Sequence, residues 1–173
     1  MNDASLGRVL PGEPPALEFV RRLAHPVDKV WAAITTREHL RSWMPCDIVG
    51  ERREGAALQL PFWPEVLERH GFDDPGLTGV VRVWDPPKVF EWTWDSDVVR
   101  FELEPDGSGT RLTLTTWLSG KDAGTAKTAA GYHVCLDHLA AVLENGTARS
   151  VVETDTASLE ARYDIVVAEP ASP

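Results

Sequence analysis

The sequence predicts an α+β fold: one strand, two short helices, a run of antiparallel strands and a single long helix. The first observation behind this prediction is the stretch PVDKVWAAITTREHLRSWMP at residues 26–45, which directly follows the extended segment LEFVRRLA. The second is a series of alternating segments over residues 77–118, joined by tight turns. The third is a helical pattern over residues 123–145. Helices in this order must cover one apolar face of the sheet.

The two short helices follow a first strand that we expect at residues 17–24. Pro26 stands at the first helical turn, where proline is tolerated. Apolar residues at three- and four-residue spacing line one side of the first helix: Val27, Val30 and Ile34. Thr36 can cap the second helix, and Pro45 ends it. The apolar side of that second helix carries Leu40, Trp43 and Met44.

The alternating segments predict an antiparallel meander with strands at 77–84, 89–95, 98–104 and 110–118. Asp85-Pro86-Pro87, Ser96 and the run 106–109 supply the turns. Alternation places these side chains on one apolar face: Val81, Val83, Phe90, Trp92, Trp94, Val99, Phe101, Leu103, Leu112, Leu114, Thr116 and Leu118. The other face is wet and carries Glu91, Asp95, Arg100, Glu102, Arg111 and Thr113. Residues 47–49 and 56–60 form a weaker strand pair.

The long helix at 123–145, ended by Asn145-Gly146, must cover the apolar sheet face. One side of it carries Ala126, Ala129, His133, Leu136, Ala140 and Leu143. Its N-terminal half is built of small residues: Ala126, Ala129, Ala130 and Gly131. Small residues opposite large aromatic side chains can leave a cavity or permit close packing, and the sequence leaves both readings open.

The chain divides into a flexible N-terminal arm at 1–15, one domain at 16–146 and a C-terminal extension at 147–173 that is partly docked. We expect the extension to dock through Leu159, Tyr163 and Val166. Residues 61–76 form a long connection over the mouth of the sheet, with one helical turn at 65–70, and can act as a lid.

Composition narrows the classes of function. The net charge of −10, from 17 basic and 27 acidic residues, argues against nucleic acid and anionic membranes as partners. No apolar run reaches the roughly 20 residues that span a bilayer, and the N-terminus lacks a secretory h-region. Cys46 and Cys135 lie far apart in the sequence without metal-type spacing, which is typical of reduced thiols in a cytoplasmic protein. We expect neither a metal nor a cofactor.

Four stretches resemble a known family: HPVDKVWAAITTREHLRSWM, GVVRVWDPPKVFEWTW, VVRFELEPDGSGTRLTLT and GYHVCLDHLAAVLENG. The chain looks like a START-like (SRPBCC, helix-grip) domain, similar to the C-terminal domain of the heat-shock-protein-90 ATPase activator. The resemblance covers residues 17–146. It implies a curved antiparallel sheet wrapped around a long C-terminal helix, with an apolar cavity between them. The chain departs from the family by having Thr116 and Trp117 where a histidine often follows the LTLT run, and by a longer connection at 61–76.

His133 is the main polar candidate, because it faces the sheet where a cavity would lie. Its imidazole could bind a ligand carbonyl or act as a base, with Asp137 one helical turn away to orient it. The favoured alternative is a histidine satisfied by structural hydrogen bonds. Arg21 alternates with Phe19 and Leu23, so it either points inward to a carboxylate or reaches solvent by snorkelling.

Aromatic side chains are the other candidates. Trp92, Trp94 and Phe101 form a stripe that fits either a pocket wall or plain core. Phe62 and Trp63 lie in the 61–76 connection, where aromatic residues are harder to explain as core. The full set of predicted ligand-binding residues is Trp43, Phe62, Trp63, Trp92, Trp94, Phe101, Thr116, His133 and Leu136.

The sequence favours a protein that holds a small apolar molecule between the sheet and the long helix, without catalysis. One alternative is a chaperone-associated interaction module, as the family name suggests. Another is an enzyme of the cyclase or hydrolase kind that uses His133. Neither a Ser/His/Asp nor a Cys/His constellation is recognisable, and HExxH spacing is absent. The free edge of the sheet permits a homodimer.

Overall fold

The computed structural model describes residues 6–71, 73–119, 124–146 and 155–168. Seven strands form one antiparallel sheet in the order β1-β2-β7-β6-β5-β4-β3. The strands are β1 (Arg8–Leu10), β2 (Ala16–Leu23), β3 (Ala57–Pro61), β4 (Gly76–Asp85), β5 (Val89–Trp94), β6 (Asp97–Asp106) and β7 (Gly109–Trp117). The helices are α1 (Val27–Thr35), α2 (Arg37–Leu40), α3 (Pro64–His70), α4 (Thr125–Asn145) and α5 (Ala157–Ala168).

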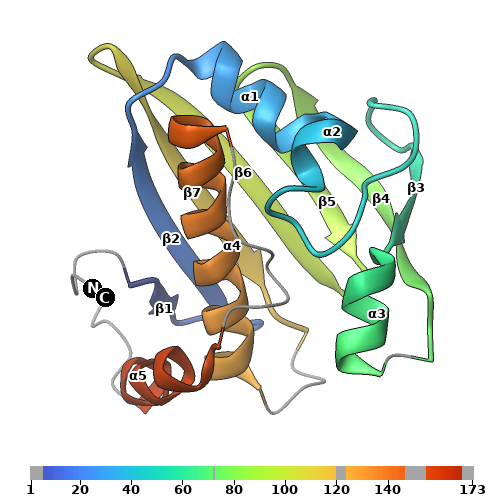
Figure 1. Cartoon of the computed structure of the whole chain (residues 1–173), viewed down its shortest axis with the longest axis vertical. Coiled ribbons are helices and arrows are strands. Elements are labelled where there is room, and N and C mark those ends of the chain that lie inside the picture. Colours follow the sequence, from blue (N-terminus) through green and yellow to red (C-terminus); the bar gives the residue numbers. More distant parts are fainter. Residues whose placement is uncertain (1–5, 72, 120–123, 147–154, 169–173) are drawn as a thin grey trace.

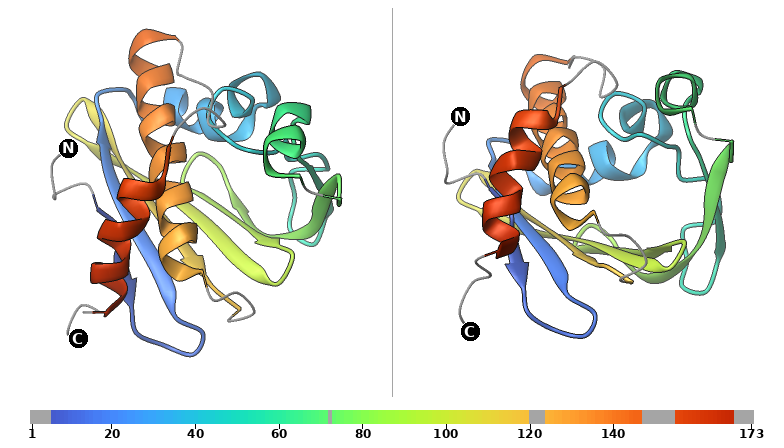
Figure 2. Two further views of the ribbon diagram at one scale, coloured as in Figure 1. Left: turned by 60° about the horizontal axis from the view of Figure 1, so that its bottom comes forward. Right: turned by 90° about the horizontal axis from the view of Figure 1, so that it is seen from below.

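The sheet curves around α4, and the helices lie on its concave side (Figures 1 and 2). This arrangement confirms the α+β fold class with two short helices after the strand β2 and long C-terminal helices against the sheet. The Asn145-Gly146 helix end is also confirmed, because Gly146 adopts a left-handed conformation with φ 74° and its N–H bonds the carbonyl of Val142. No helix in the described part of the chain is long and apolar enough to cross a membrane.

The concave face of the sheet supplies the core. Phe19, Leu114, Phe101 and Phe90 pair across β2, β7, β6 and β5, and all four are buried. The convex face is polar, as predicted. There Glu91 is 8% exposed, and its carboxylate forms ion pairs with Arg82 and Arg100 at 3.2 and 2.9 Å.

One face assignment is wrong. Alternation predicts Val81 and Val83 on the same apolar face, but a register shift between them breaks the alternation in β4. Val83 pairs with Glu91, whose side chain is on the convex face, while Trp84 pairs with Phe90. The Trp84 ring packs edge-on against Phe90, with 5.1 Å between ring centroids. An extra residue in one strand moves every following side chain to the other face.

The predicted cap of α2 also differs. Thr36 occupies the N-cap position, but its hydroxyl donates 2.8 Å to the carbonyl of Ala32 and makes no cap bond to α2. Pro26 likewise stands one residue before α1 begins. The apolar side predicted for the second helix is correct, because Leu40, Trp43 and Met44 are all buried.

Both ends of the chain add to the domain. Residues 8–10, predicted as part of a flexible arm, form β1 and pair with β2, where Val9 is buried. Residues 47–49, predicted as a strand, make only isolated bridges beside β3, such as that between Val49 and Gln59. In the extension, Leu159 and Tyr163 of α5 are buried against the rest of the molecule.

Helix α3 replaces the single turn predicted inside the 61–76 connection. Pro64 occupies its first turn, and Gly71 ends it in the left-handed region at φ 62°. Trp63 fixes the start of α3, because its indole N–H donates 2.7 Å to the carbonyl of Met44. Arg41 stacks on the same ring, 4.9 Å from its centroid.

Candidate functional site

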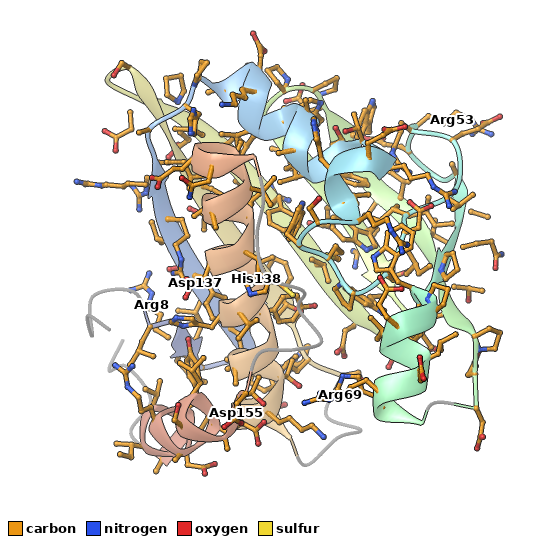
Figure 3. All side chains as sticks on the ribbon, viewed as in Figure 1. Arg8, Arg53, Arg69, Asp137, His138 and Asp155 are labelled. Atoms are coloured by element: carbon orange, nitrogen blue, oxygen red, sulfur yellow. The ribbon has the colours of Figure 1, made fainter. Side chains whose placement is uncertain are left out.

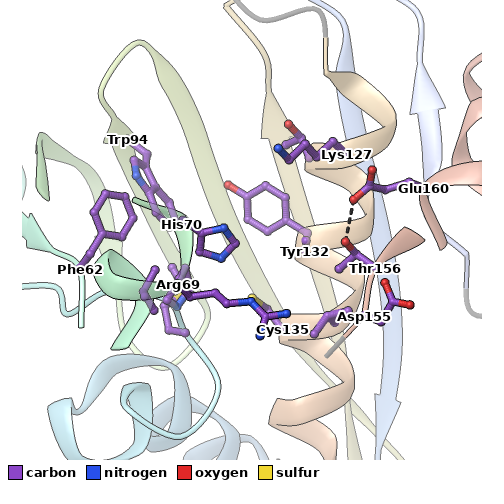
Figure 4. A pocket seen from close by; sticks show the side chains of 16 residues that line it. Phe62, Arg69, His70, Trp94, Lys127, Tyr132, Cys135, Asp155, Thr156 and Glu160 are labelled. Atoms are coloured by element: carbon purple, nitrogen blue, oxygen red, sulfur yellow. Dashed lines mark hydrogen bonds between the residues drawn. The ribbon is translucent and has the colours of Figure 1, made fainter. Parts of the chain in front are cut away.

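An open groove of about 510 Å³ lies between α3, α4 and the first turn of α5 (Figure 4). The segment after α2 and the strand β5 complete its walls. Its lining residues are Met44, Pro45, Phe62, Val66, Arg69, His70, Trp94, Lys127, Thr128, Gly131, Tyr132, Val134, Cys135, Asp155, Thr156 and Glu160. The volume falls within the range of small-molecule sites.

Aromatic side chains and a glycine shape the groove. The ring of Tyr132 stands edge-on to that of Trp94, with 6.5 Å between centroids and an interplanar angle of 88°. Phe62 lies beyond Trp94 on the α3 side (Figure 4). A Cβ atom added to Gly131 would meet no other atom within 4 Å, so the glycine borders open space. The small residue in mid-helix therefore leaves room instead of permitting close packing.

The groove carries charges on both sides. Arg69 and His70 come from the last turn of α3, and Figure 4 shows Arg69 reaching toward α4. Asp155 and Glu160 come from the beginning of α5 and have partners there. The Oδ1 of Asp155 accepts the N–H of Ala157 at 3.0 Å, and the Oε1 of Glu160 accepts the Thr156 hydroxyl at 2.6 Å.

Burial raises the pKa of two groups that line the groove, the Tyr132 phenol and the Cys135 thiol. It raises the pKa of Tyr132 well above its ordinary value, although the neighbouring Thr116 hydroxyl acts in the opposite direction. It also raises the pKa of the Cys135 thiol to about 12. Cys46 is fully buried, and burial raises its pKa further still, with Cys135 and Asp47 adding to the effect. Neither thiol has the low pKa of a nucleophile.

His133 lies on the opposite flank of α4 and does not line the groove. Its side chain is 0% exposed, and its Nδ1 lies 2.8 Å from the hydroxyl of Tyr163. That hydroxyl accepts the N–H of Gly7 at 2.9 Å. On the other side of the ring, Nε2 lies 3.3 Å from Oδ2 of Asp137. Nδ1 is thus hydrogen-bonded, while Nε2 has a contact within ion-pair distance that lacks the geometry of a hydrogen bond.

Arg21 completes this chain of polar contacts. It points inward, with its side chain 10% exposed, and its Nη2 lies 3.5 Å from Oδ1 of Asp137. Burial alone would raise the pKa of Asp137, but His133 and Arg21 together hold it below its ordinary value. Figure 3 shows Asp137 and Arg69 on opposite sides of α4. The carboxylate that Arg21 needs is thus one of the protein's own.

Of the nine residues predicted to bind a ligand, two line the groove: Phe62 and Trp94. The other seven are buried in the core or behind α4: Trp43, Trp63, Trp92, Phe101, Thr116, His133 and Leu136. Trp43 and Trp63 each donate an indole N–H to a backbone carbonyl, of Ala33 and of Met44. Trp92 stacks on Phe101 with 5.8 Å between centroids. The stripe is therefore mostly core, and only its Trp94 end is accessible.

Sequence reasoning missed Tyr132 and Arg69 as groove residues. Tyr132 lies next to His133 in the sequence but on an adjacent side of the helix, and only the side that carries His133 was considered from the sequence. Arg69 belongs to the helix that was predicted as a single turn. The small residues of α4, including Gly131, were the available signal, but in the sequence they permitted either a cavity or close packing. Among the described residues, no three His, Cys, Asp or Glu side chains gather in a way that could hold a metal ion.

Solved structures share this fold. A conserved protein of unknown function from Enterococcus faecalis aligns with a TM-score of 0.77 at 18% identity, covering 96% of this chain and 92% of that one. CalU16 from Micromonospora echinospora aligns with a TM-score of 0.67 at 20% identity, covering 95% and 96%. The Aha1 dimer from Colwellia psychrerythraea aligns with a TM-score of 0.60 at 21% identity, covering 77% and 98%.

A comparison with curated proteins gives no match. Residues 24–144, by contrast, match the family described as Activator of Hsp90 ATPase homolog 1-like protein. The matched residues run from just before α1 to the penultimate residue of α4, so they include the meander and the α4 wall of the groove. The chain therefore belongs to the Activator of Hsp90 ATPase homolog 1-like family, within the SRPBCC superfamily.

Proposed function

We propose that this protein binds a small, ring-containing apolar molecule in the groove between α3 and α4. The observation that carries the proposal is the combination of Gly131, which borders open space, with the aromatic rings of Phe62, Trp94 and Tyr132. Sites of this kind are concave and mostly apolar, with a few polar groups that fix the orientation of the ligand.

Binding would be driven by removal of apolar surface from water, at roughly 25 cal/mol per Å² before association costs. The edge-on pair of Trp94 and Tyr132 offers a flat ring both a face and an edge to contact. The Tyr132 phenol is neutral at physiological pH, as any ordinary tyrosine is, and burial raises its pKa further, so its O–H can donate to a polar atom of the ligand.

The arrangement favours binding over catalysis. His133, the base of the enzyme alternative, is fully buried, and Tyr163 and Asp137 occupy both of its ring nitrogens on the far flank of α4. Cys135 lines the groove, but its raised pKa keeps the thiol protonated at neutral pH. Neither the thiol of Cys135 nor the imidazole of His133 therefore supplies an activated group to the groove.

Fluorescence of N-phenyl-1-naphthylamine, a neutral aromatic probe, tests the proposal. We expect the wild type to bind the probe saturably. Gly131→Phe should fill the groove and weaken binding by about tenfold or more, which corresponds to about 1.4 kcal/mol. The matched control Glu144→Phe adds the same ring to the exposed last turn of α4 and should bind like the wild type. No saturable binding to the wild type, or equal binding to Gly131→Phe, would contradict the proposal.

A second candidate function, association with a chaperone, rests on the family to which the chain belongs. The Aha1 protein from Colwellia psychrerythraea is a dimer, which makes a homodimer the first assembly to examine. Sedimentation of this protein alone and with a purified heat-shock-protein-90 chaperone separates the two assemblies. A monomer that sediments unchanged with the chaperone would reject both.

A further inference from the structure

Arg69 stands out among the described arginines of a chain with an excess of acids. The sequence has 27 acidic and 17 basic residues, so partners for an arginine are plentiful. Eight arginines form ion pairs with Asp or Glu: Arg8, Arg21, Arg22, Arg37, Arg41, Arg53, Arg82 and Arg100. Within the described residues, no hydrogen bond or ion pair involves Arg69, although its side chain lines the groove.

The acids of the groove form no ion pair with Arg69. Asp155 accepts the N–H of Ala157, and Glu160 accepts the hydroxyl of Thr156, so each carboxylate has one oxygen hydrogen-bonded at the beginning of α5. The groove lysine, Lys127, also lines a second hollow together with Glu160 and Asp164, and like Arg69 it forms no ion pair within the described residues. Among the groove residues that the structure describes, Arg69 and Lys127 are therefore cations without an ion pair, and Arg69 is the one with a planar guanidinium.

The position of Arg69 relates it to the aromatic wall. It stands in the last turn of α3, one helical turn after Val66, which also lines the groove. Figure 4 shows its side chain extending across the groove to end beside Cys135 of α4, below the ring of His70, which lies between Trp94 and Tyr132 in this view. A flat ring in the groove can direct a substituent to this guanidinium. A planar guanidinium binds a carboxylate through two parallel hydrogen bonds.

We propose that the natural ligand is an aromatic carboxylic acid, whose ring packs against Trp94 and Tyr132 and whose carboxylate pairs with Arg69. This inference rests on the proposed function and adds the chemical class of the ligand. It makes Arg69 the residue that determines specificity, while the aromatic wall supplies affinity for any flat ring.

Calorimetric titration with three matched naphthalene compounds tests the inference. They are 2-naphthoate, 2-naphthalenemethanol and 2-naphthylmethylammonium, which share a ring system and differ in charge. We expect 2-naphthoate to bind the wild type about fivefold or more tightly than the alcohol, and the ammonium compound to bind most weakly. Arg69→Gln should remove the preference for the carboxylate and leave the affinity for the alcohol unchanged. Arg111→Gln, the same substitution at an exposed arginine outside the groove, should keep the preference.

The remaining outcomes overturn the inference and can be told apart. Equal binding of the alcohol and 2-naphthoate to the wild type would reject the acidic ligand and leave the apolar groove in place. A carboxylate preference that survives in Arg69→Gln would reject Arg69 as the specificity residue. Tighter binding of the ammonium compound would indicate that the natural ligand is a cation recognised by Asp155 and Glu160. Absence of binding by all three compounds would reject the proposed function together with the inference.

Discussion

The two flanks of helix α4 differ in how closely other elements cover them. The flank toward α5 and β2 is filled, with His133 and Tyr163 fully buried and joined by a 2.8 Å contact. The flank toward α3 stays open at Gly131, beside the half-buried ring of Tyr132. On the filled flank, polar side chains from different elements contact one another. The open flank exposes apolar rings, which is costly unless another molecule covers them.

The comparison explains why a histidine on a helix face is a poor guide to a site. On the filled flank, the imidazole of His133 contacts Tyr163 and Asp137, and Asp137 in turn contacts Arg21. The network ties β2, α4, α5 and the backbone at Gly7 together. A packed polar network of this kind supports the fold, and none of its residues lines the groove. The space for a ligand is on the flank that carries glycine and tyrosine.

The largest expected effect is the loss of stability when the filled flank is emptied. Tyr163→Ala should lower the free energy of unfolding by about 3–5 kcal/mol, because it leaves a cavity among buried side chains. Tyr163→Phe keeps the ring but leaves the Gly7 N–H and His133 Nδ1 unpaired, which should cost about 1–3 kcal/mol. Urea denaturation measures both variants. An unfolding free energy equal to that of the wild type in both would show that the flank is not packed as described.

The open flank should respond in the opposite direction. Gly131→Ala should raise the free energy of unfolding by about 0.5–1 kcal/mol, because glycine in the middle of a helix costs about that much relative to alanine. The added methyl group meets no atom within 4 Å, so no clash offsets the gain. Thermal unfolding by circular dichroism measures the change. A destabilised Gly131→Ala variant would mean that the helix is tightly covered at this position.

The smallest expected effect is the pH dependence that Asp137 adds on the filled flank. Because its pKa is lowered in the folded protein, Asp137 stabilises the fold above its unfolded pKa of about 4, and this contribution is lost as pH falls through the folded pKa. Its side chain is half exposed, so the contribution should stay below about 1 kcal/mol. Asp137→Asn should therefore show a shallower loss of unfolding free energy below pH 4. Parallel curves for the two proteins would contradict the described contacts.

The sequence predicted the fold closely because periodicity and turn chemistry are local. The meander followed from alternation and from turns such as Asp85-Pro86-Pro87, and the end of α4 followed from Gly146. The face of Val83 was missed, because a register shift in β4 depends on pairing with β5 and leaves no mark in the composition of the strand.

The site was less predictable, since it depends on which packed surfaces meet. Phe62 and Trp94 line the groove, whereas Trp63, which looked equally available in the sequence, is buried and donates its indole N–H to the Met44 carbonyl. His133 drew attention by its chemistry, although α5, from a separate part of the chain, covers it. Nothing in the sequence around Arg69 marked it as a groove residue, because which acids lie near an arginine is decided by the folded structure.

The two tyrosines provide the most direct test of the central claim, because the chain has only these two and one lies on each flank of α4: Tyr132 in the groove and Tyr163 in the packed network. Fluorine resonances of protein labelled with 3-fluorotyrosine would be followed during titration with 2-naphthoate, with Tyr132→Phe to assign them. The account predicts that the Tyr132 resonance shifts saturably while that of Tyr163 stays in place. A shift of Tyr163 alone, or of neither resonance up to the solubility limit of the ligand, would contradict it.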